Sequence, residues 1–91
     1  MDFSRLPGGD LVERGLRDLA ESRDTEAADL VLIGAPRLRR LGLEVPLDRS
    51  AGAEHRLYLR LAAEDSRTAH SRYNALIRRL VSFERAAECA G

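Results

Sequence analysis

The apolar residues between positions 69 and 87 recur at spacings of three and four: Ala69, Tyr73, Leu76, Leu80, Phe83 and Ala87. This heptad-like pattern predicts one long amphipathic helix, from about Ser66 to Cys89, with Asp65 as its N-cap. The 91 residues are enough for one domain and too few for two. The other elements must therefore pack against this helix, and we expect Leu76 and Leu80, at the centre of the stripe, to be fully buried.

The first helix is predicted over residues 10–22, after an N-terminal arm of residues 1–9 that contains Pro7-Gly8-Gly9. Asp10 stands three residues before Glu13, which is the spacing of a capping box with Asp10 as the cap. Gly15, in the middle of this helix, indicates close approach of another helix backbone. Charges at i,i+4 spacing predict a solvated opposite face made of Asp10, Glu13, Arg14, Arg17, Asp18 and Glu21.

Three further helical segments are predicted, over about residues 25–33, 36–41 and 51–63. Asp24 or Thr25 caps the first of them, and Gly34 and Gly42 end the first and second. The core face of the last one consists of Leu57, Tyr58, Leu61 and Ala62.

Leu59 lies outside that core face, so the segment is either covered on two sides or takes part in an interface. Together these segments predict an all-α fold, a small bundle of four helices plus a short helical turn. It forms a single domain over residues 1–91, with a long C-terminal helix.

Charge and cysteine content restrict the functional class. The 15 basic residues, all Arg, balance 15 acidic ones, which argues against a dedicated nucleic-acid-binding protein. A GC-rich, bacterial genome explains the absence of Lys more simply than chemistry does. The lone Cys89 fits a reducing compartment. Because no apolar run is long enough for a signal peptide or a membrane span, we expect a cytoplasmic protein without a membrane partner.

Residues 24–41 contain the one candidate nucleic-acid motif, a helix-turn-helix. Two short helices meet at Gly34-Ala35, and Arg37, Arg39 and Arg40 lie on the second. Such a motif places arginines near phosphates or base edges. The second helix is shorter than a usual recognition helix, so we expect a tight corner with solvated arginines. A nucleic-acid-associated regulator stays as an alternative.

Charged residues on the last helix give further candidates. Arg72 and Arg79 flank the apolar stripe, an arrangement that favours ion pairs with a neighbouring helix over contacts to RNA phosphates. Glu84 falls inside the apolar arc, so it should pair with an arginine or have a raised pKa. Glu54 has a similar angular position on its helix. If both carboxylates face one core, a small ligand-binding or enzymatic domain is a second alternative.

No catalytic or metal-binding pattern emerges. His55 and His70 lack a paired-ligand spacing, Cys89 is near a terminus, and four zinc ligands cannot be assembled. There is no phosphate-binding glycine loop and no nucleophile with an evident base. We therefore expect no metal, no cofactor, no small-molecule substrate and no enzymatic activity.

The function predicted is protein–protein interaction, with a second copy or with another protein. The apolar surface of the last two helices exceeds what a small bundle can cover, because only about 60–65 % of such a chain's surface is buried on folding. A homodimer is the commonest outcome for such a patch. The expected interface residues are Leu59, Arg72, Tyr73, Arg79, Phe83 and Glu84.

Overall fold

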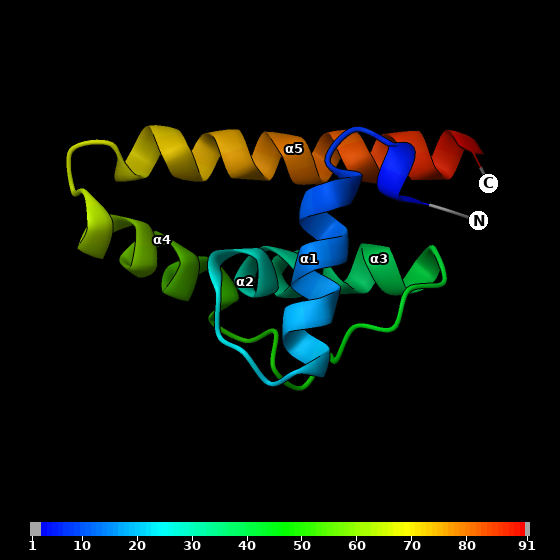
Figure 1. Cartoon of the computed structure of the whole chain (residues 1–91), viewed down its shortest axis with the longest axis horizontal. Coiled ribbons are helices and arrows are strands. Elements are labelled where there is room, and N and C mark those ends of the chain that lie inside the picture. Colours follow the sequence, from blue (N-terminus) through cyan, green and yellow to red (C-terminus); the bar gives the residue numbers. More distant parts are fainter. Residues whose placement is uncertain (1–2, 91) are drawn as a thin grey trace.

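The fold, seen in a computed structural model that describes residues 3–90, consists of helices joined by short loops (Figure 1). No strand occurs in this part of the chain, so the predicted all-α class is confirmed. Each predicted helix is present with ends shifted by up to three residues. The elements are η1 (Phe3–Arg5), α1 (Gly9–Ala20), α2 (Glu26–Ile33), α3 (Ala35–Arg40), α4 (Ala53–Glu64) and α5 (Ala69–Ala90).

Helix α5 runs along the whole length of the molecule, and α4, α2 and α3 follow one another beneath it (Figure 1). Its stripe is buried at Ala69, Leu80, Phe83 and Ala87, which confirms the prediction for Leu80. The prediction of full burial for Leu76 is wrong, because Leu76 is half-buried. The reason is that Leu76 lines an open groove, together with Leu11 of α1, and no helix within residues 3–90 packs over it at this point.

Helix α2 is the centre of the core. Its residues from Ala27 to Leu32 are all buried, as expected of a helix covered on several sides. Helices α1, α4 and α5 all pack against it. The close approach predicted at Gly15 is confirmed, since a Cβ there would collide with the Ala27 carbonyl oxygen and with Val31 Cγ2.

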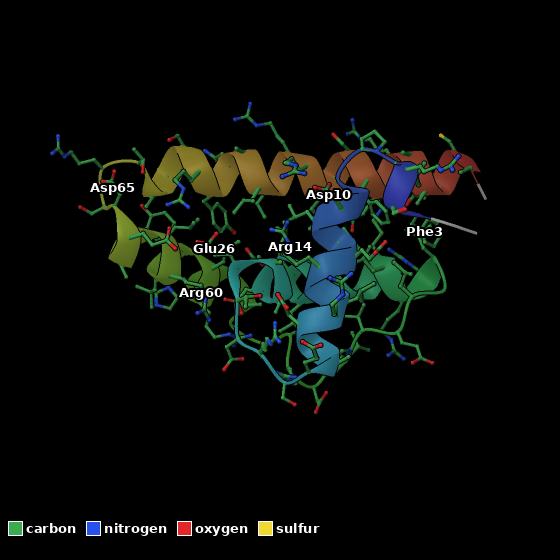
Figure 2. The ribbon with its side chains drawn as sticks, viewed as in Figure 1. Phe3, Asp10, Arg14, Glu26, Arg60 and Asp65 are labelled. Atoms are coloured by element: carbon green, nitrogen blue, oxygen red, sulfur yellow. The ribbon has the colours of Figure 1, made fainter. Side chains whose placement is uncertain are left out.

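The start of α1 differs from the predicted capping box. The N-cap is Gly8, whose φ of 73° is left-handed, and no side chain caps the helix. A Cβ on Gly8 would lie 2.6 Å from the Arg79 carbonyl oxygen, so α5 passes too close for a larger residue. Asp10 instead lies within the first turn, where Figure 2 shows it at the end of α1 nearest α5.

The predicted solvated face of α1 is correct only in part. Arg17 and Glu13 form an exposed ion pair of 3.4 Å, but Asp18 is buried. The reason is the next helix: Thr25 Oγ1 donates a 2.7 Å hydrogen bond to Asp18 Oδ2. Thr25 is also the N-cap of α2, as predicted, because its Oγ1 accepts from the Ala28 N–H at 3.1 Å.

The turn between α4 and α5 also corrects two predictions. Helix α5 begins at Ala69 rather than Ser66, and Asp65 Oδ1 accepts from the Arg67 N–H at 3.0 Å, which stabilises the preceding turn rather than the helix. On α4, Leu57 and Leu61 are fully buried, whereas Tyr58 is 37 % exposed. Tyr58 therefore lies at the edge of the core face and not within it.

Candidate functional site

The predicted interface residues separate into buried and exposed sets. Phe83 is fully buried and packs edge-to-face against Phe3 of η1, with ring centroids 5.6 Å apart. Glu84 is buried as well, at 4 % exposure. Neither side chain is therefore available to a partner of the folded chain. Sequence analysis placed them at an interface because it did not foresee that η1 and α3 cover this part of α5.

The two flanking arginines of α5 form ion pairs with other helices of the same chain. Arg72 Nη1 lies 2.9 Å from Glu64 Oε2 of α4, and its Nη2 lies 3.6 Å from Glu26 Oε1 of α2. Arg79 Nη2 lies 3.0 Å from Asp10 Oδ1 of α1. Both arginines are thus paired with acids of the same chain, and these ion pairs connect α5 to α1, α2 and α4.

Leu59 and Tyr73 remain at the surface, and the structure adds Tyr58 to them. The rings of Tyr58 and Tyr73 meet edge-to-face at 5.9 Å, and Leu59 is 53 % exposed beside Tyr58. We call these three residues the tyrosine face. Burial and the neighbouring Glu54 carboxylate raise the pKa of Tyr73, so its hydroxyl stays protonated. The face is apolar with phenol groups that can donate hydrogen bonds.

A second cluster joins α3 to α5. Arg37 Nε donates to Glu88 Oε1 at 2.6 Å, and its Nη1 lies 3.5 Å from Glu84 Oε1. Burial raises the pKa of Glu84, while the hydrogen bond from Arg37 lowers the pKa of Glu88. The arginine partner and the raised pKa expected for Glu84 are thus both present. Arg37 connects two acids one helical turn apart.

The arginines of the proposed helix-turn-helix have mostly structural contacts. Arg37 is engaged by two acids, and Arg39 Nη1 donates to the Val45 carbonyl oxygen at 2.9 Å, which holds the following loop. Arg40 is exposed. Gly34 alone separates α2 from α3, whereas a helix-turn-helix uses a turn of three or four residues. The two helices follow each other end to end (Figure 1).

The two carboxylates of the ligand-binding alternative lie in different surroundings. Glu54 is exposed at the start of α4 and acts electrostatically on Tyr73, so the expectation that it faces the core is wrong. Glu84 is buried near Arg37, Arg40 and Glu88. The first turn of α4 meets the core through Ala53, whereas Glu54 of the same turn is exposed and close enough to Tyr73 to raise its pKa. The structure does not bring these carboxylates together.

A carboxyl pair that sequence analysis missed joins α2 to α4. Glu26 lies on the side of α2 that faces α5 (Figure 2), and it shares a hydrogen bond with Glu64. Burial followed by this hydrogen bond raises the pKa of Glu26, and the same bond together with Arg72 lowers the pKa of Glu64. Glu26 is therefore the one of the two carboxyls that keeps its proton to the higher pH, and Arg72 lies next to both. Both residues line an open groove with Arg14, Asp18 and Leu76.

Sequence analysis also missed the buried carboxylate of Asp29. Its Oδ2 lies 3.1 Å from Arg60 Nε and its Oδ1 lies 3.5 Å from Arg56 Nε, so two arginines of α4 neutralise it. A signal was present in the sequence, since Asp29 interrupts the otherwise apolar run from Ala27 to Ile33. A polar residue in such a run has to be paired when it is buried. Asp29 thus fixes α4 on α2.

Within residues 3–90 no group of three His, Cys, Asp or Glu side chains is arranged to hold a metal ion. In the same part of the chain no helix is both long and apolar enough to cross a membrane. Comparisons of the chain with models of protein families, with curated proteins and with solved structures find no significant match.

Proposed function

We propose that this chain is a protein–protein interaction module that forms a homodimer through the tyrosine face. The observation that carries the proposal is the exposure of Leu59 (53 %) and Tyr58 (37 %), next to the half-buried Tyr73. Single exposed apolar residues are ordinary on a soluble protein. Here Leu59 and Tyr58 are consecutive exposed residues of α4, and Tyr58 packs against Tyr73 of α5, which supports an interaction surface. Tyrosine is also enriched in interfaces, because it buries a large area and keeps a hydrogen-bonding hydroxyl.

A homodimer through this face needs an interface of ordinary size. A stable dimer buries about 800 Å² on each copy. That area is about one-seventh of the 5573 Å² accessible surface of this chain. A two-fold axis through the tyrosine face brings the same residues of both copies together, so one apolar patch is enough for both sides. The rim must come from residues other than Arg72 and Arg79, because both are paired within the chain.

Sedimentation equilibrium at micromolar concentration tests this proposal. The wild-type chain should sediment with a mass near twice 10.1 kDa. Leu59→Glu should restore the monomer mass without unfolding it, because the side chain is exposed. Leu47→Glu is the matched control: it places the same charge on a leucine that is 47 % exposed in the loop between α3 and α4. A wild-type mass of 10.1 kDa over the whole concentration range would contradict self-association.

A further inference from the structure

A groove between α3 and α5 lies apart from the tyrosine face. Its walls are apolar: Ile33 and Pro36 belong to the α2–α3 side, and Ile77 and Val81 belong to α5. Ile33 and Ile77 are only half-buried and pack on the edge of the core. The groove has a volume of about 290 Å³, enough for the apolar side chains of one helix face rather than for a whole domain. The buried Leu80 also lines it.

Gly34 sets the depth of this groove. A Cβ there would lie 3.1 Å from Leu80 Cδ1 and 3.1 Å from Glu84 Oε2. Its φ of −85° is open to any residue, so the backbone does not require a glycine at this position. The missing side chain instead lets Leu80 and Glu84 of α5 pack closely against the α2–α3 junction. These three residues line the groove together with its apolar walls.

The rims of the groove carry more positive than negative charge in the described part of the chain. The two acids near it, Glu84 and Glu88, form ion pairs with Arg37, and Arg40 and Arg85 act on Glu88 only at longer range. On the α3 side, Arg40 is exposed and makes no ion pair within residues 3–90. On the α5 side, two exposed arginines, Arg78 and Arg85, also lack ion pairs there. They stand at i−3 and i+4 from Val81, so they are its neighbours on the same face of α5.

We propose that the α3–α5 groove binds an acidic amphipathic helix of a partner protein. An apolar groove accepts the leucine stripe of a helix at i, i+3 or i+4, and i+7 spacing. Glutamate and aspartate beside that stripe face Arg40 on one rim and Arg78 with Arg85 on the other, which gives charge complementarity. Apolar walls do not suit a nucleic-acid backbone, which binds through phosphate contacts.

The probe is a fluorescein-labelled synthetic peptide of about 16 residues, long enough to be helical when bound. It has a leucine stripe on one face and glutamate and alanine elsewhere. Fluorescence anisotropy should show saturable binding. Arg40→Glu should weaken it by about tenfold, equivalent to ~1.4 kcal/mol, and less at high salt. Arg67→Glu is the matched control, because Arg67 is an exposed arginine in the α4–α5 turn. It should leave the affinity unchanged.

Two control peptides and a map of the contact site complete the experiment. A peptide of the same composition with leucines spread around the helix, and one with lysine for glutamate, should bind at least tenfold more weakly. Amide chemical shifts should change at Ile33, Ile77 and Val81 and stay constant at Leu59. The proposal is wrong if either control peptide binds equally well, if the shifts map elsewhere, or if the acidic peptide fails to bind up to about 1 mM.

Other occupants give distinguishable results. A single-stranded RNA oligomer that binds more tightly than the peptide, and depends on Arg40, would assign the rim to nucleic acid and overturn the proposal. If the Leu59→Glu variant were still a dimer and the peptide dissociated it, the groove would be the site of a second copy. That result would also overturn the proposal of a partner helix. Failure of the tyrosine face alone leaves the peptide result unaffected, because the two surfaces share no residue in these tests.

Discussion

Replacing Gly15 with alanine should destabilise the protein, although the same change stabilises most helices. Alanine is favoured over glycine by about 1 kcal/mol in a helix interior. Here the added methyl group collides with the Ala27 carbonyl oxygen and with Val31 Cγ2 across the α1–α2 contact. Overpacking costs about 1–3 kcal/mol, and a backbone carbonyl cannot rotate away, so the upper end applies. The net loss of unfolding free energy should be about 2 kcal/mol.

Thermal unfolding followed by circular dichroism measures this loss. For a domain of this size, 2 kcal/mol corresponds to a decrease in Tm of roughly 8–16 °C. Arg14→Ala is the control on the neighbouring exposed position of α1, and it should change the unfolding free energy by no more than about 0.5 kcal/mol. A Tm of Gly15→Ala equal to or above that of the wild type would refute the tight α1–α2 contact.

Three further predictions concern burial, capping and pH. Leu80→Ala should cost about 2–5 kcal/mol of unfolding free energy and Leu76→Ala less than half of that, because only Leu80 is buried; equal losses in urea unfolding would contradict the structure. Thr25→Ala should cost about 1–2 kcal/mol by removing the α2 cap and a donor to Asp18, whereas Thr25→Ser should keep most of the stability; equal melts of the two variants would exclude the cap. The folded-state pKa of Glu84 is raised, so its protonated form is stabilised by folding, and this contribution is lost as pH rises from the ordinary value of 4.5 through the folded-state value. The Tm of Glu84→Gln minus the Tm of the wild type should therefore increase as the pH rises through this range. A Tm difference that does not change with pH would show that the pKa of Glu84 is not raised.

Local sequence patterns were enough to predict the helices. The stripe on α5 follows from apolar spacing, and the end of α2 follows from Gly34. The α2 cap follows from Thr25, since it needs only the residues beside it. Local patterns did not predict which neighbour covers each face. Asp10 has the spacing of a cap, but Gly8 takes that role, because α5 passes within 2.6 Å of where a Cβ of Gly8 would stand.

The candidate sites depended still more on long-range packing. Phe83 and Glu84 have the positions of interface residues on a helical wheel, but η1 and α3 cover them. The carboxyl pair of Glu26 and Glu64 joins residues 38 positions apart in the sequence, and no single-helix pattern connects them. Leu59 is a partial exception. Its angle outside the core face of α4 left either a second covering neighbour or an interface, and its 53 % exposure excludes the covering neighbour within residues 3–90.

The most direct test of the proposed dimer is a search for contacts between two copies at the tyrosine face. An isotope-filtered NOE experiment on an equal mixture of labelled and unlabelled chains detects only intermolecular proximity. The account predicts cross-peaks from the methyl groups of Leu59 to the aromatic protons of Tyr58 and Tyr73 of the other copy. Intermolecular cross-peaks confined to other residues, or none at all at a concentration where the mass is that of a dimer, would contradict it.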